Sequence, residues 1–216
     1  MHKSLIGRAI LAFRNETVNE FNNILLDRMP GLDHRFEAVN HVEMREEDAV
    51  SEPFSAESLQ SIELASIPPS CLKLTIAAPV ILIRNLSPKQ GLCNGTRMRV
   101  LGIGRNCLQV AILGSKWDGE VRLLSRIKLT TSEEDLPFIL EKKKQFPIRV
   151  CFAMTVNKSQ GQSLQQVGVD LRTNPFTHGQ LYVALSRVTS LDGLTILPSP
   201  GTPALTQNVV FSEVHL

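Results

Sequence analysis

The order in which two sequence patterns occur along the chain most constrains how it can fold. Residues 9–31 and 150–197 alternate short apolar runs with helical patterns, whereas residues 72–129 hold closely spaced β-branched runs separated by turn signals. A strand–helix unit, a small β module and a β-α-β-α-β unit, in that order, predict one α/β domain interrupted by an insertion. We expect residues 1–76 and 146–216 to form that domain and residues 77–145 a small antiparallel barrel.

The first strand–helix unit is predicted from periodicity. "AILAF" at residues 9–13 can be a buried strand, and "NETVNEFNNILLDRMPG" follows it with a helical repeat. The apolar face is expected to comprise Val18, Phe21 and Leu25. Either Asn15 caps this helix, or Thr17 and Glu20 form a capping box.

The middle of the chain predicts several short strands with tight turns. "APVILIRN", "RMRVLGI", "LQVAIL" and "EVRLL" are separated by Asn94-Gly95 and Asp118-Gly119, which are hairpin signals. Residues 77–83 are also expected to close the preceding α/β layer. Acidic residues dominate residues 37–63, which predicts a solvated connection with a short helix at 59–62.

One polar loop is the first candidate site. In "CFAMTVNKSQGQSL", residues 151–164, a predicted strand runs into Asn-Lys-Ser-Gln-Gly-Gln before an expected helix. Open α/β sheets bind ligands at the carboxyl ends of their strands, and a glycine there lets backbone amides approach a phosphate. The residues alone leave two interpretations, a ligand-contacting loop and an ordinary strand-to-helix turn.

A second candidate lies in "THGQLYVALSRV", residues 177–188, a predicted helix. Gln180 and Arg187 are two turns apart on one stripe, which predicts a common target. The structural alternatives are a capping box of Thr177 with Gln180 and a solvated or carboxylate-paired Arg187. The functional alternative is a guanidinium directed across a cleft at a triphosphate.

Several function classes are not indicated. A formal charge of +2 does not require a nucleic-acid partner, and the clusters at residues 142–144 and at Arg97 with Arg99 are expected to be solvated surface. The cysteines lack zinc or disulfide spacing, which favours a reducing intracellular compartment, and no membrane-length apolar run occurs. Ser159, Asp170 and His178 could form a triad only on paper, since no nucleophile elbow presents a serine.

The two candidate motifs together carry a family resemblance. "FAMTVNKSQGQSL" and "HGQLYVALSRV" resemble the fifth and sixth helicase motifs of the petite-integration-frequency (PIF) family of superfamily-one DNA helicases, which includes Helitron replication helicases. "AILAFRN" resembles the fourth motif, and "CLKLTIAAPVILIRNLSPKQGLCNGTRMRV" the start of an inserted barrel of Src-homology-three type. The resemblance implies a second RecA-like domain with a parallel sheet, interrupted by that barrel.

The resemblance also implies residue roles. Thr155, Asn157 and Lys158 would contact single-stranded DNA, and Gln160 and Gly161 would link that contact to the nucleotide cleft. Arg187 would be the arginine finger on the γ-phosphate. Arg14 and Gln180 are further candidates for the nucleotide cleft.

The chain departs from the family pattern in one respect. It holds no "G-x-x-x-x-G-K-[ST]" phosphate loop and no Walker B acidic pair. In the family these motifs lie on a first RecA-like domain, so the expected partners are that domain and single-stranded DNA. ATP and Mg²⁺ are expected in a complete 5′ to 3′ helicase, and neither is expected on this chain alone.

The biological setting follows from the resemblance only. It implies DNA replication, repair, recombination and telomere maintenance, and it favours the nucleus over the mitochondrion. A non-catalytic module that binds DNA or a partner, and an inert transposon-derived remnant, are the alternatives.

Overall fold

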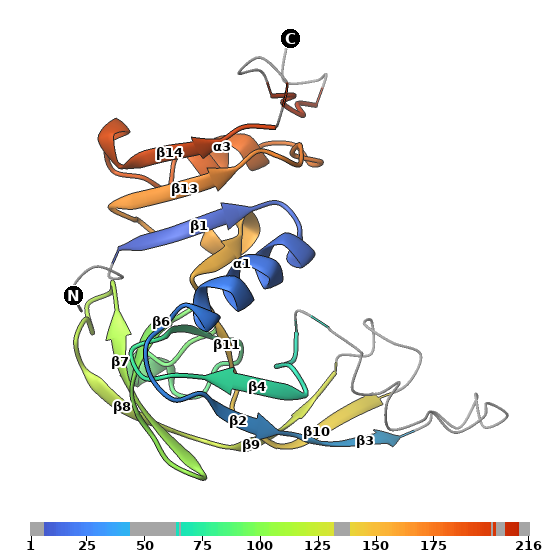
Figure 1. Ribbon diagram of the computed structural model, residues 1–216, viewed down its shortest axis with the longest axis vertical. Helices are drawn as coiled ribbons and strands as arrows, with labels where there is room; N and C mark the ends of the chain where they lie inside the picture. Colours follow the sequence, from blue (N-terminus) through green and yellow to red (C-terminus); the bar gives the residue numbers. More distant parts are fainter. Residues whose placement is uncertain are drawn as a thin grey trace, which may run out of the picture. The chain divides into compact units, whose positions relative to one another are not determined.

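The structure is a computed structural model that describes residues 7–43, 64, 66–131, 139–199, 201 and 206–211 (Figure 1). The chain divides into two compact units, one of residues 1–29 with 150–216 and an inserted one of residues 30–149. The insertion therefore begins well before the expected residue 77. Its extra strands pair with one another and with later strands of the same unit, which is why they group with it.

The first unit is built on a four-stranded parallel sheet (Figure 1). Its order is β12 (Ala153–Thr155), β1 (Arg8–Ala12), β13 (Gln166–Asp170) and β14 (Leu194–Leu197). The core of the sheet comes from β12, β1 and β13, with Leu11 in β1 fully buried, whereas Ile196 and Leu197 in the edge strand β14 are exposed. The predicted strands at residues 9–13, 167–171 and 193–197 and the parallel sheet are confirmed.

Helix α1 (Asn15–Asp27) follows β1. It buries Val18, Asn22 and Leu26, while Phe21 packs against the cluster of Ala12, Val18 and Ala153. The buried stripe is therefore rotated from the expected face. The predicted caps are wrong, because Arg14 occupies the N-cap position and no side chain there bonds the helix end.

The inserted unit contains a five-stranded sheet with short turns. Its order is β11 (Ile148–Val150), β5 (Pro79–Leu82), β6 (Arg97–Ile103), β7 (Cys107–Leu113) and β8 (Val121–Ser125). Strands β5 to β8 pair antiparallel, as predicted, and Gly95 and Gly119 take positive φ in the two turns. The expectation that residues 77–83 also close the α/β layer is wrong, since β5 lies between β6 and β11.

Five further strands complete the described part of the insertion. They are β2 (His34–Glu37) paired with β4 (Cys71–Leu74), and β3 (Val39–Glu43), β10 (Ile139–Gln145) and β9 (Ile127–Thr130) in a second sheet. Residues 37–43 are thus not a solvated connection. The helix predicted at residues 59–62 lies outside the described residues.

Each of the two basic clusters that were expected to be solvated contains one buried residue. Lys142 is 0% exposed, and its Nζ donates to Pro68 O and Ser70 Oγ, each at 2.9 Å. Arg97 is buried as well, whereas Lys143 is exposed. Residues 139–145 form strand β10, in which Lys142 lies between buried Glu141 and exposed Lys143, so the prediction that the whole cluster is solvated is wrong.

Helices of the described segments are all too short or too polar to cross a membrane.

Candidate functional site

The polar loop begins where β12 ends. Thr155 is half-buried, and residues Val156–Ser159 form a single 3₁₀ turn, η4. Within this turn Ser159 is buried and its hydroxyl donates to Val156 O at 2.6 Å. Ser159 therefore closes the turn, and the side chain of Asn157 stays exposed on its outer side.

The loop then crosses to the amino end of β13 without an α-helix. Gln160 and Gly161 are exposed, and Gly161 has a φ of 78°, which favours glycine because it has no Cβ. The chain next runs extended to Leu164, whose N–H donates to Arg187 O at 2.8 Å. The expected helix after Gly161 is wrong, so no helix dipole acts on a ligand at this glycine.

Helix α3 (Gln180–Leu185) carries the second motif and packs against η4. Gln180 is 4% exposed, and its Oε1 accepts from the N–H groups of Phe176 at 3.1 Å and Thr177 at 3.3 Å. The predicted capping box is wrong, because Gly179 is the N-cap of α3 and no side chain caps the helix. The two bonds instead tie Gln180 to the segment before the helix, which accounts for its buried position. A nucleotide contact by Gln180 stays a prediction.

Arg187 joins the two motifs. Its guanidinium donates to Val183 O at 3.0 Å, to Gln162 O at 3.3 Å and to Ser186 Oγ at 2.9 Å. Its backbone carbonyl accepts from Leu164, as described above. Arg187 thus holds the extended segment after Gly161 against the end of α3. The side chains of Arg187 and Gln180 bond different groups, so the common target predicted for them is not found among their hydrogen-bond partners.

Arg14 lies at the same edge of the sheet as the loop. It is exposed, at the end of β1, and Ala12 is in register with Thr155 on the neighbouring strand. Parallel strands end at one edge, so Arg14 after β1 and Thr155 and Asn157 at the end of β12 lie at the same edge of the sheet. Their predicted roles toward DNA and nucleotide stay predictions. Arg187, which follows α3, bonds Gln162 O after the loop, whereas Gln180 bonds the N–H groups of Phe176 and Thr177.

Two other polar groups near this edge are engaged structurally. The buried carboxylate of Asp170 binds the Arg172 guanidinium, with Nε–Oδ1 and Nη2–Oδ2 distances of 3.0 and 2.7 Å. Hydrogen bonding to Asp170 raises the pKa of Arg172. His178 Nδ1 accepts from Phe211 N–H at 3.0 Å, so Ser159, Asp170 and His178 each have other partners and form no triad.

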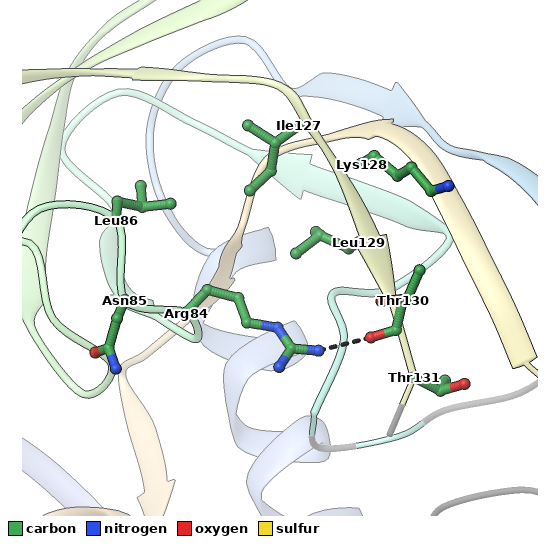
Figure 2. A pocket seen from close by; sticks show the side chains of 8 residues that line it. All are labelled: Arg84, Asn85, Leu86, Ile127, Lys128, Leu129, Thr130 and Thr131. Carbon is green, nitrogen blue, oxygen red and sulfur yellow. Dashed lines mark hydrogen bonds between the residues drawn. The ribbon is translucent and has the colours of Figure 1, made fainter. Parts of the chain in front are cut away.

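A cavity of about 320 Å³ lies in the inserted unit and was not predicted from the sequence (Figure 2). It is lined by Arg84, Asn85, Leu86, Ile127, Lys128, Leu129, Thr130 and Thr131. Figure 2 shows Arg84 reaching toward β9, where its Nη2 donates to Thr130 O at 2.6 Å. Lys128 forms an ion pair with Glu141. The two cationic side chains that line the cavity, Arg84 and Lys128, are therefore both bonded to other residues of the inserted unit.

Glu141 gives this unit a pH dependence. Hydrogen bonding from Lys128 lowers the pKa of this buried carboxyl from the ordinary 4.5, against the opposing effect of burial. Because the pKa of Glu141 is lower in the folded protein than in the unfolded chain, its ionised carboxylate stabilises the fold above pH 4.5. This stabilisation is lost as the pH falls through the pKa of the folded state.

Replacing Glu141 by glutamine is therefore expected to destabilise the protein at pH 7 and to matter progressively less below pH 4.5. Urea unfolding of wild type and Glu141→Gln across this range measures the difference. Glu16→Gln, which removes an exposed carboxylate on α1, is the control. A difference between wild type and Glu141→Gln that is constant with pH would contradict the assignment.

Among the described residues, no group of three or more His, Cys, Asp or Glu is placed to hold a metal ion.

Comparison with known proteins gives consistent matches. A family model described as DNA helicase Pif1, 2B domain, matches residues 57–103, within the insertion, and one described as helicase matches residues 125–213. The ATP-dependent DNA helicase PIF1 of Homo sapiens is 35% identical over 180 residues, covering 82% of this chain. The chain spans 25% of the length of that relative.

Solved structures share the fold. The crystal structure of Pif1 helicase from Candida albicans superposes with a TM-score of 0.68 and 26% identity, over 90% of this chain and 46% of that one. Pif1 helicase from Bacteroides, in complex with ADP-AlF3 and ssDNA, shares the fold with a TM-score of 0.61 at 19% identity, over 96% of this chain and 43% of that one. The sequence matches and the RecA-like fold together show that this chain belongs to the Pif1 family of DNA helicases.

Proposed function

We propose that this chain is the portion of an ATP-dependent 5′ to 3′ DNA helicase that contacts single-stranded DNA and senses the nucleotide. The observation that carries the proposal is the junction at Arg187, which ties the exposed loop after β12 to α3. A ligand bound at either motif would bear on the other through this junction. The direction of movement rests on the family resemblance alone.

The loop has the chemistry of a backbone-binding surface. Asn157 and Gln160 present exposed amides, Lys158 adds a positive charge, and Arg14 adds a second charge at the same edge. Amides and cations bind phosphate and sugar oxygens without reading sequence. The Bacteroides Pif1 structure, which has the same fold, contains single-stranded DNA. It therefore supports single-stranded DNA as the ligand of this loop.

Arg187 is the proposed arginine finger. A guanidinium has five N–H donors, and three bonds to protein oxygens leave further donors and the full charge for a γ-phosphate oxygen. ATP would supply the phosphoryl group that is transferred. The sequence holds no phosphate loop and no Walker B acidic pair, so we assign these motifs and the Mg²⁺ that they bind to a first RecA-like domain as partner.

A non-catalytic module that binds DNA or a partner helicase would use the same loop without a nucleotide. We favour a helicase portion because the fourth, fifth and sixth motifs all belong to one unit of the fold. A nuclear rather than mitochondrial enzyme is the corresponding proposal for localisation.

The purified 216-residue chain is expected to bind single-stranded DNA and to show no ATP turnover. Fluorescence anisotropy across a salt series is expected to give a log–log slope of about −0.7 per neutralised phosphate. Phosphate release is measured on the same sample with and without DNA. DNA-stimulated turnover would contradict the assignment of the phosphate loop to another domain, and absence of DNA binding would contradict the proposed function.

A further inference from the structure

Asn22 is a buried polar side chain that none of the proposed roles uses. It lies on α1 at 8% exposure, between Val18 and Leu26 on the apolar stripe. Its Oδ1 accepts from Phe152 N–H at 2.9 Å and from Ala153 N–H at 2.8 Å, and its Nδ2 donates to Ala153 O at 3.0 Å. Three hydrogen bonds thus join one side chain to the backbone that begins β12.

These bonds lie on the side of β12 that has no neighbouring strand in the described part of the sheet. In the described part of the sheet β12 is an edge strand, paired on one side with β1, where Ile10 N–H donates to Phe152 O at 3.0 Å. Groups of an edge strand that face away from the sheet need other partners. The amide of Asn22 supplies both a donor and an acceptor to Ala153, as a further strand would.

We propose that Asn22 is a positioning residue for the DNA-contacting loop, because it fixes the start of β12 from the side opposite β1. Thr155 is two residues beyond Ala153, and η4 with Asn157 follows directly. The inference rests on the proposed function of this loop. It also links the loop to Arg14, since Arg14 is the N-cap of the helix that carries Asn22.

The linkage to Arg14 follows from helix rigidity. Asn22 is eight positions after Arg14 in the sequence, which corresponds to about 12 Å along an α-helix. Locking Asn22 to β12 therefore adds a second tie, beside the pairing of Ala12 with Thr155, between the helix that begins after Arg14 and the loop. A DNA backbone that contacts both Arg14 and the loop requires the distance between them to be constant.

Asn22→Ala, Asn22→Asp and the control Asn23→Ala test this role. Asn23 is exposed on the same helix, so its replacement changes the same side chain without touching β12. Asn22→Asp keeps an acceptor for the two N–H groups and replaces the donor to Ala153 O by a carboxylate oxygen, which places a buried negative charge against that carbonyl. It is the variant that keeps the test interpretable where Asn22→Ala does not fold.

Amide spectra of ¹⁵N-labelled protein report the positioning directly. In both Asn22 variants the resonances of Thr155 and Asn157 are expected to shift, and in Asn22→Ala the Phe152 and Ala153 amides are expected to exchange faster with solvent. Asn23→Ala is expected to leave all four unchanged. Unmoved Thr155 and Asn157 resonances in folded Asn22 variants would overturn the proposal, whether or not the chain binds DNA.

Affinity for a single-stranded oligonucleotide then tests the consequence. The Kd is expected to rise about tenfold for Asn22→Ala, as if the displaced loop lost one ordinary hydrogen bond to the DNA, and about threefold for Asn22→Asp. A purely structural role would lower the melting temperature while the Kd of the folded variants stayed at the wild-type value, and that result would overturn the proposal. If wild type binds no DNA, the proposed function fails and the spectra still decide the role of Asn22.

Discussion

Replacing Arg187 by alanine is expected to lower ATP turnover by about 10³- to 10⁵-fold once the chain is fused to a first RecA-like domain with Walker A and B motifs. An arginine finger stabilises charge that develops only in the transition state, so the loss falls on kcat. The bonds from Arg187 to Val183 O and Gln162 O hold the guanidinium in place before the nucleotide arrives. The wild-type fusion is expected to hydrolyse ATP with stimulation by single-stranded DNA.

Two further variants separate the finger from a general charge effect. Arg187→Lys keeps the charge but loses the planar array of donors, and is expected to remain strongly impaired. Arg105→Ala removes the same formal charge from an exposed turn of the inserted unit and is expected to turn over ATP like wild type. Melting temperature and DNA affinity of each variant check that the fold survives. Undiminished kcat in folded Arg187→Ala would contradict the finger assignment.

The parallel sheet could be predicted because its strands are locally apolar and clearly bounded. β1, β13 and β14 each occupy a short β-branched or aliphatic run that ends in a polar residue or a turn signal. Burial of such runs on both faces is typical of parallel sheets. The hairpins of the insertion were predictable for a similar reason, since Asn94-Gly95 and Asp118-Gly119 specify tight turns.

Strand β10 could not be predicted because its stability comes from distant partners. "EKKKQ" has the composition of a solvated link, yet Lys142 is fully buried. Its Nζ bonds Pro68 O and Ser70 Oγ, and Gln145 Nε2 bonds Phe36 O at 2.8 Å. A charged side chain is buried only where hydrogen bonds compensate its desolvation, and residues so far apart in the sequence give no local signal of that.

The position of the candidate loop after a strand could be predicted, but the course of its backbone could not. A glycine after a strand suggested a helix N-terminus, but η4 and an extended segment make the crossover to β13. Asn22 was missed although its signal was available, since Val18, Asn22 and Leu26 follow a four-residue repeat. An amide at the centre of an apolar stripe indicates a buried hydrogen-bond partner.

Replacing Gly193 by alanine is expected to destabilise the protein by about 3 kcal/mol, the upper end of the usual cost of overpacking. A Cβ at this buried position would lie 2.0 Å from Gln165 O and 2.9 Å from Val188 Cγ2. Gln165 and Val188 border the junction where the segment after Gly161 runs beside the end of α3. Backbone must therefore move at the place where Arg187 holds the two motifs together.

Thermal unfolding measures this effect, with an expected fall in melting temperature of roughly 6–12 °C for a chain of this size. Gly168→Ala is the matched control, because a Cβ there would meet Ile10 Cγ1 at an ordinary 3.7 Å within β13. That change is expected to be neutral or slightly stabilising, since glycine weakens a strand interior. Equal melting temperatures for wild type and Gly193→Ala would mean that the segments at Gln165 and Val188 separate easily. The coupling of the DNA loop to α3 through Arg187 would then lack the rigid junction on which it depends.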